Sequence, residues 1–230
     1  MCGIAGVLAK DSRHDVTSLV ERLTSAHAHR GPDGSGYRFF RGRSAAFGHR
    51  RLSIVDLEGG AQPMSNEDGS VWVVFNGELY NHLDLRRELE ALGHRFRTRS
   101  DVEAVVHGWE AWGTGILERM NGMYAFALFD GRGNGAGEVW LGRDPAGIKL
   151  LYVGVAGDLW WFVSELAAAA AARAGISERH RDLSIRLNGA LESGSVSLGQ
   201  GEVRALVAVL EEEHSGRFGS AAAELRGAVA

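Results

Sequence analysis

The single cysteine of the chain, Cys2, follows Met1 directly. A small second residue is the circumstance in which an initiator methionine is normally removed, and Cys2 would then become the first residue. An N-terminal cysteine carries a nucleophilic thiol and a free α-amine, whose unperturbed pKa of about 7.7–8.0 suits a general base near neutral pH. Such a nucleophile needs no histidine or aspartate partner. The alternative is that Cys2 is merely a small residue beside a start codon, and its position alone favours that alternative.

The composition excludes several other chemistries. One cysteine cannot form an internal disulfide or a multi-cysteine zinc site. The nine histidines are scattered without the close pairing of a metal-binding helix, so we expect no metal. The formal net charge of −4 offers no basic excess for a phosphate backbone, so we expect no nucleic-acid partner. The N-terminal segment does not resemble a secretory signal, and the apolar run 166–172 is too short to cross a bilayer, so we expect a cytoplasmic protein without a membrane partner.

The elements that must position Cys2 are short strands joined by glycine-rich turns, since the chain has 32 glycines and only 3 prolines. Apolar and β-branched runs predict strands over 3–8, 37–40, 45–56, 71–75, 123–130, 138–143, 151–155 and 159–163. Helical spacing predicts helices over 16–28, 83–92 and 101–112, with two more helical turns over 115–120. The strand 71–75 should stop at Asn76-Gly77, a pair that is typical of turns. Helices between groups of strands favour two sheets, each covered by helices on its outer face.

The composition changes after residue 166. Residues 167–172 form an alanine run of high helix propensity. The remaining 58 positions contain no Trp, Tyr, Pro or Cys, and their apolar residues Val203, Leu206, Val207 and Leu210 recur at helical spacing. We therefore divide the chain into a domain over 1–170 and an alanine-rich, helical tail over 171–230.

Seven segments of the chain together carry a family resemblance. They are MCGIAGVL, HRGPDGSG, GHRRLSIVDLEGGAQPM, VFNGELYNH, RTRSDVEAVVHGWEAWG, ERMNGMYAFALFD and LGRDPAGIK. In this order and spacing they resemble the class II glutamine amidotransferase domain of glutamine-hydrolysing asparagine synthetases, from Met1 to about residue 166. The resemblance implies an α+β fold, a four-layer αββα sandwich of the N-terminal-nucleophile hydrolase type, which agrees with the two helix-covered sheets of the pattern.

The resemblance also implies a mechanism and a set of site residues. The Cys2 thiolate would attack the side-chain amide carbon of glutamine, release ammonia and form a thioester that water hydrolyses. The oxyanion of the intermediates would be bound by the Asn76 amide and the Gly77 backbone N–H. The other glutamine-binding residues that the resemblance implies are Arg51 for the carboxylate, Glu78 and Asp101 for the ammonium, and Ile54 and Val55 along the wall. Each has an ordinary alternative: Asn76-Gly77 could be a simple turn, and Asp101 a helix N-terminal charge.

The family marks its ATP-dependent synthetase domain with an SGGxDS loop, which this chain lacks. We therefore expect no cofactor for the glutaminase half-reaction, with ATP and Mg²⁺ used only by a synthetase domain or subunit outside this chain. The expected partners are L-glutamine and that synthetase, and a homodimer is left open.

Two alternatives remain beside the enzyme. The first is a non-catalytic remnant that binds glutamine or a partner subunit, although a remnant has no need of both the nucleophile and the oxyanion donors. The second is an amidotransferase that supplies a sugar or ribosyl acceptor. The RLSIVD and NGELYNH segments favour the asparagine synthetase type.

Overall fold

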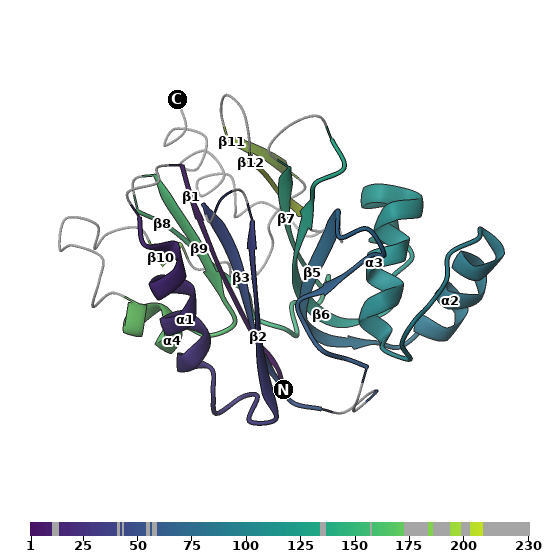
Figure 1. Cartoon of the computed structure of the whole chain (residues 1–230), viewed down its shortest axis with the longest axis horizontal. Coiled ribbons are helices and arrows are strands. Elements are labelled where there is room, and N and C mark those ends of the chain that lie inside the picture. Colours follow the sequence, from purple (N-terminus) through teal and green to yellow (C-terminus); the bar gives the residue numbers. More distant parts are fainter. Residues whose placement is uncertain are drawn as a thin grey trace.

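Two six-stranded sheets lie face to face in the computed structural model, and helices cover their outer faces (Figure 1). The structure describes residues 1–10, 14–40, 42, 44–53, 56, 59–133, 137–156, 158–172, 184–185, 194–198 and 203–208. The expected four-layer αββα arrangement is therefore confirmed. Among the described residues, no helix has both the length and the apolar character that crossing a membrane requires.

The first sheet has the strand order β10-β8-β9-β1-β3-β2. Its strands are β1 (Gly3–Ala9), β2 (Gly34–Phe40), β3 (Ala45–Arg51), β8 (Tyr152–Ala156), β9 (Leu159–Val163) and β10 (Ser184–Ile185). The helices α1 (Val16–Ala26) and α4 (Leu166–Ala172) cover it. The central strand β1 pairs antiparallel with both β3 and β9, and in this register Gly3 lies opposite Arg50.

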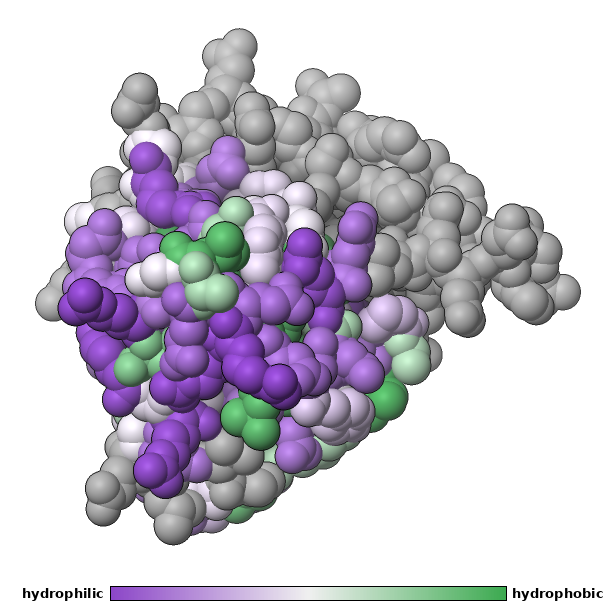
Figure 2. All heavy atoms as spheres, turned by 90° about the vertical axis from the view of Figure 1, so that its right-hand side faces the viewer, coloured by the Kyte–Doolittle hydropathy of each residue, from purple (hydrophilic) through white to green (hydrophobic). Residues whose placement is uncertain are grey.

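The second sheet has the order β11-β12-β7-β6-β5-β4. Its strands are β4 (Met64–Ser65), β5 (Val71–Leu79), β6 (Gly122–Asp130), β7 (Glu138–Arg143), β11 (Gly194–Leu198) and β12 (Val203–Ala208). The helices α2 (His82–Ala91) and α3 (Asp101–Trp112) cover it, and a short 3₁₀ helix, Gly113–Ile116, follows α3. The face on which α2 and α3 lie is largely hydrophilic, with small separate groups of hydrophobic side chains (Figure 2).

Alternation of side chains along β1 explains why the segment after Cys2 is apolar throughout. Ile4 and Leu8 point into the core between the two sheets, where they meet side chains such as Phe47. Ala5 and Val7 point the other way, into the core beneath α1 and α4. A strand buried on both faces has no polar side, and its backbone is fixed by ladders on both edges. The residue before this strand therefore has a well-determined position.

The strand expected over 45–56 ends at Arg51, and residues 52 and 53 are not in a strand. Two further sequence predictions for the fold were wrong. The strand β5 does not stop at Asn76-Gly77 but continues through this pair to Leu79, in register with β6. The glycine serves close approach rather than a turn, since a Cβ at position 77 would lie 2.2 Å from the Met123 carbonyl oxygen. The second error is the helix expected over 203–210, where the structure has β12, antiparallel to β11 and parallel to β7. The β-branched residues there favour an extended chain, and β7 offers an edge for pairing. Most of the remaining tail lies outside the described residues, and the division at residue 170 stays a prediction.

Gly48 provides a test of how tightly α1 packs on the first sheet. A Cβ at this position of β3 would lie 1.9 Å from Oγ1 of Thr24, a buried side chain of α1. We expect Gly48→Ala to lower the free energy of unfolding by about 1–3 kcal/mol, because the helix must shift to accept the methyl group. Gly133→Ala is the control, since a Cβ there meets nothing within 4 Å. Urea unfolding of both variants measures the difference, and equal stability would contradict the packing described.

Candidate active site

An open cavity lies where β1 begins and β3 ends, and β5 and the start of α3 form its other walls. Six of the eight residues expected at the site line it: Cys2, Arg51, Asn76, Gly77, Glu78 and Asp101. The other two, Ile54 and Val55, lie outside the described residues. The fold thus gathers six side chains and backbone groups from four separate segments around one space.

Cys2 directly precedes β1, and its neighbours fix it on both sides. The Arg30 guanidinium donates from Nε to the Cys2 carbonyl oxygen at 2.9 Å and from Nη1 to Glu165 at 2.6 Å. The Leu52 backbone N–H lies 3.4 Å from Cys2 Sγ, and the Leu52 carbonyl oxygen lies 3.6 Å from the same sulfur. The thiol is therefore held between the start of β1 and the segment that leaves β3.

Met1 shares the cavity with Cys2. The ammonium of Lys149, a buried side chain, donates to Met1 Sδ at 2.8 Å. While Met1 is attached, the nitrogen of Cys2 is part of a peptide bond and cannot serve as an amine base. The arrangement becomes a nucleophile with its own base only when that peptide bond is cut.

The open edge of β5 determines which backbone groups face the cavity. Phe75 and Leu79 direct their hydrogen-bonding groups away from β6, because the Phe75 N–H donates to Gln62 Oε1 at 2.6 Å and the Leu79 N–H to Asp101 Oδ2 at 2.9 Å. Gly77 lies midway between them and, by the two-residue period of a strand, directs its N–H to the same edge. No side chain among the described residues accepts a hydrogen bond from it. The Gly77 N–H is therefore a backbone donor beside the cavity.

Asn76 adds a second donor next to it. The residue is 1% exposed, and its Nδ2 has no hydrogen-bond partner within the described part of the chain. An unpaired buried amide costs roughly 1–3 kcal/mol, so a native structure that keeps one calls for a reason. Two adjacent donors that lack an acceptor suit an oxygen atom that gains negative charge during a reaction.

Charged groups of both signs border the same cavity. Asp101 is buried at the start of α3, and this burial raises the pKa of its carboxyl group, while the hydrogen bond from the Leu79 N–H partly offsets the effect. Glu78, half-buried, follows Gly77 on β5. Arg51 ends β3 and donates from Nη2 to the Asp56 carbonyl oxygen. An arginine together with two carboxylates can bind the carboxylate and the ammonium of a free amino acid.

Asp56 was not singled out from the sequence, yet it joins the two loops beside the cavity. Its backbone adopts a φ of 48°, which short polar residues such as aspartate tolerate. Oδ1 accepts from the Gly59 N–H at 2.9 Å, and Oδ2 accepts from the Arg99 N–H at 2.7 Å. These hydrogen bonds lower the pKa of the Asp56 carboxyl, the one from Arg99 most strongly. Asp56 thereby connects the segment after Arg51 to the loop before α3.

Gln62 and Lys149 are two further cavity residues that the sequence analysis missed. The side-chain amide of Gln62 pairs with the backbone of Phe75 as a neighbouring strand would. It accepts from the Phe75 N–H and donates to the Phe75 carbonyl oxygen at 3.2 Å. No carboxylate of the described residues lies within 4 Å of Lys149 Nζ. Both residues stand in segments that carried the resemblance, but only the fold shows that their side chains reach the cavity.

Comparisons with known proteins give one family. The family model described as "Glutamine amidotransferase domain" matches residues 1–187. Asparagine synthetase [glutamine-hydrolyzing] 1 of Bacillus subtilis is 39% identical over 168 residues, which are 72% of this chain and 26% of that protein. Asparagine synthetase [glutamine-hydrolyzing] 3 of Arabidopsis thaliana is 40% identical over 170 residues, which are 73% and 28%. The chain thus spans little more than a quarter of these relatives.

A solved structure shares the fold. Glutamine phosphoribosylpyrophosphate (PRPP) amidotransferase from B. subtilis, complexed with ADP and GMP, superposes with a TM-score of 0.64. Its sequence identity is 23%, and the match covers 75% of this chain and 44% of that one. At this identity, the likeness concerns the fold alone.

The connecting role of Asp56 can be tested without any assay of activity. We expect Asp56→Gly, which keeps the left-handed backbone accessible but removes the carboxylate, to speed amide exchange at Arg99 and Gly59 by about tenfold or more. Hydrogen exchange followed by NMR measures these two amides. Asp33→Ala is the matched control, because Asp33 binds the same loop at the Ser53 N–H instead. Unchanged exchange at Arg99 in Asp56→Gly would contradict the connection.

Proposed function

Because the chain belongs to the glutamine amidotransferase domain family, we propose that its cavity hydrolyses L-glutamine to L-glutamate and ammonia, with Cys2 as the nucleophile. The observation that carries this proposal is the convergence of the Cys2 thiol with two donors that lack an acceptor, the Asn76 amide and the Gly77 N–H. A protein that only bound glutamine would need the charged groups of the cavity but not this combination.

The charged groups account for substrate binding. Arg51 would pair with the α-carboxylate of glutamine, and Asp101 and Glu78 with its α-ammonium. These contacts fix the amino-acid end of the substrate and leave its side-chain amide directed toward Cys2. Ile54 and Val55 stay predictions for the wall of the site.

The chemical step then follows from the groups present. The Cys2 thiolate attacks the side-chain amide carbon, and the carbonyl oxygen becomes an oxyanion that accepts from Asn76 Nδ2 and the Gly77 N–H. Collapse of this intermediate breaks the C–N bond. The α-amine of Cys2, which took the thiol proton, returns it to the departing nitrogen, so ammonia leaves and a thioester remains. Water adds to the thioester with the amine again as base, and glutamate departs with the thiol restored.

The acceptor of the ammonia is the second part of the proposal. The identity of 39–40% to asparagine synthetases favours an asparagine synthetase type of partner, domain or subunit, over a sugar or ribosyl acceptor. ATP and Mg²⁺ would then act at that partner, and the glutaminase half-reaction on this chain would need no cofactor.

Labelling with a glutamine-analogue electrophile tests the nucleophile. The chain, treated with methionine aminopeptidase so that Cys2 is the first residue, is incubated with diazo-oxo-norleucine and weighed by intact mass spectrometry. We expect one adduct per chain, on Cys2, and protection by excess glutamine. Cys2→Ser, treated in the same way, should form none. A processed wild-type chain that takes no adduct would overturn the proposal in favour of a non-catalytic remnant.

The oxyanion role predicts a specific kinetic change. We expect Asn76→Ala to lower kcat for glutamate release by about 10²- to 10³-fold, with a much smaller change in KM, because the lost donor binds charge that develops in the transition state. Asn81→Ala is the matched control, since Asn81 bonds to Arg119 and Asn121 outside the cavity. A variant Asn76→Ala with the kcat of the wild type would exclude the role.

A further inference from the structure

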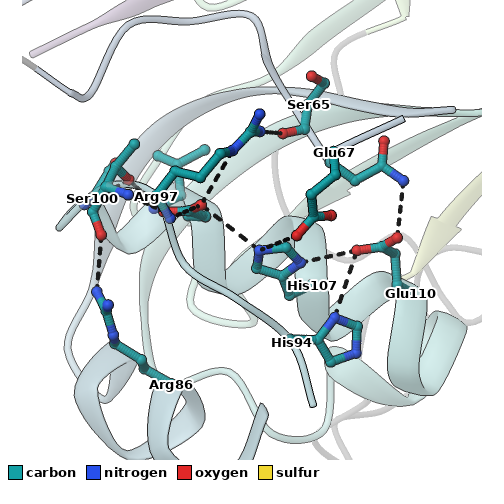
Figure 3. A network of polar contacts seen from close by, with 12 residues as sticks. Ser65, Glu67, Arg86, His94, Arg97, Ser100, His107 and Glu110 are labelled. Carbon is teal, nitrogen blue, oxygen red and sulfur yellow. Dashed lines mark hydrogen bonds and ion pairs between the residues drawn. The ribbon is translucent and has the colours of Figure 1, made fainter. Parts of the chain in front are cut away.

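A second cluster of titratable side chains lies further along α3 than Asp101, and none of its residues lines the cavity (Figure 3). It consists of His107 and Glu110 on α3 and His94 on the loop that follows α2. One ligand atom from each of the three residues lies within 4.8 Å of the others. The sequence analysis expected no metal because the histidines were not paired along the chain, but the fold pairs two of them across separate segments.

The distances in this cluster are close to those of a coordination sphere. Glu110 Oε2 lies 2.9 Å from His107 Nδ1 and 3.8 Å from His94 Nδ1. A tetrahedral Zn²⁺ with bonds of about 2.0–2.2 Å separates neighbouring ligand atoms by roughly 3.3 Å, and the two observed distances bracket that value. His94 follows Gly93, whose positive φ marks a turn, so this histidine stands on the segment best able to adjust.

The surroundings also match those of a metal site. A histidine that binds a metal through one nitrogen usually directs the other to a carboxylate, and the binding carboxylate is itself hydrogen-bonded. His107 Nε2 faces Glu103 Oε1 at 3.7 Å and Glu67 Oε1 at 4.0 Å. Glu110 uses its other oxygen, Oε1, to accept from Asn66 Nδ2 at 2.8 Å. Figure 3 shows Glu67 beside the two histidines and Glu110.

The charge around His107 favours a cation. Its side chain is 1% exposed, and the carboxylates of Glu67, Glu103 and Glu110 all lie within 4.0 Å of its ring nitrogens. Its Nδ1 shares a hydrogen bond with Glu110 Oε2 at 2.9 Å, while its Nε2 has no hydrogen-bond partner among the described residues. Two arginines lie near these carboxylates in the described structure: Arg97 Nε is 4.0 Å from Glu103, and Arg132 Nη1 donates to the Glu110 carbonyl oxygen at 3.2 Å. A divalent ion would add positive charge at a place where three carboxylates surround one histidine.

We propose that His94, His107 and Glu110 bind one first-row transition-metal dication of the Zn²⁺ type, with the fourth position taken by water. The site would tie the loop after α2 to the middle of α3. This loop continues through Arg97 and Thr98, whose backbone N–H groups both donate to Glu103 at 2.7 Å, to Asp101 at the cavity. Metal binding would therefore stiffen the segment that presents Asp101, and it does not depend on the glutaminase proposal.

Titration of the full chain with Co²⁺ tests the site directly. Cys2→Ser serves as the background, because it removes the thiol and so prevents binding at the cavity. We expect one equivalent of Co²⁺ to give the visible absorption of a tetrahedral ion, and Zn²⁺ to displace it. In the same background, His94→Ala and Glu110→Gln should each weaken binding by about tenfold or more.

The matched control is His14→Ala, because His14 pairs with Asp158 outside the cluster. It should bind Co²⁺ as the background does. Circular dichroism with EDTA present verifies that each variant is folded. If His94→Ala is unfolded, Glu110→Gln, which keeps the size of the side chain, tests the proposal alone. Absence of a tetrahedral spectrum, or affinity that Glu110→Gln leaves unchanged, would overturn the proposal.

Discussion

The edge of β5 beyond its short pairing with β4, from Phe75 to Leu79, is the constraint on which the cavity depends. A strand edge exposes backbone donors that need acceptors, and this edge has them in sequence: Gln62 accepts from the Phe75 N–H and Asp101 from the Leu79 N–H. Because these two side chains flank Gly77 on either side, a continuous partner strand is excluded there. The same contacts that close the rest of the edge thereby leave the Gly77 N–H facing the cavity.

The opposite wall of the cavity depends on burial rather than on hydrogen bonding. The strand β1 is packed between the sheets on one face and against α1 and α4 on the other, so its start cannot move without disturbing two cores. In addition, Arg30, which is paired with Glu165, donates a hydrogen bond to the Cys2 carbonyl oxygen. The Cys2 thiol and the donors it faces thus stand on strands, while the segment after Arg51 and the loop before α3 are joined by Asp56. This division suits an enzyme that must admit and release a small substrate next to a fixed reaction centre.

Much of the fold could be predicted from sequence because local patterns agree with the tertiary contacts. The helix over 101–112 was predicted with its bounds, since Ser100 is an N-cap and apolar residues recur at helical spacing. Asn76-Gly77 was wrongly predicted to end the strand, because the pair is typical of turns. The glycine is needed here because β6 approaches it closely, which only the tertiary structure reveals. Asp56, Gln62 and the pairing of His94 with His107 were missed for the same reason: each depends on which loops meet, and no periodicity encodes that. The family resemblance predicted the six cavity residues. The structure adds why Asp101 and Gly77 stand there: Asp101 accepts from the edge of β5, and Gly77 directs its N–H from that edge to the cavity.

The register of β1 against β3 fixes the position of the N-terminus relative to Arg51. Gly3 lies opposite Arg50, so the thiol that precedes Gly3 and the guanidinium that follows Arg50 are set by counting residues along two paired strands. One residue inserted between Cys2 and Gly3 would carry the sulfur about 3.3 Å along the sheet and turn it to the other face. The position of the Cys2 thiol therefore depends on the number of residues between it and β1, whereas side chains of β1 could be exchanged for others of similar volume without moving it. In this part of the protein, an insertion would thus disturb the cavity more than a substitution of similar volume.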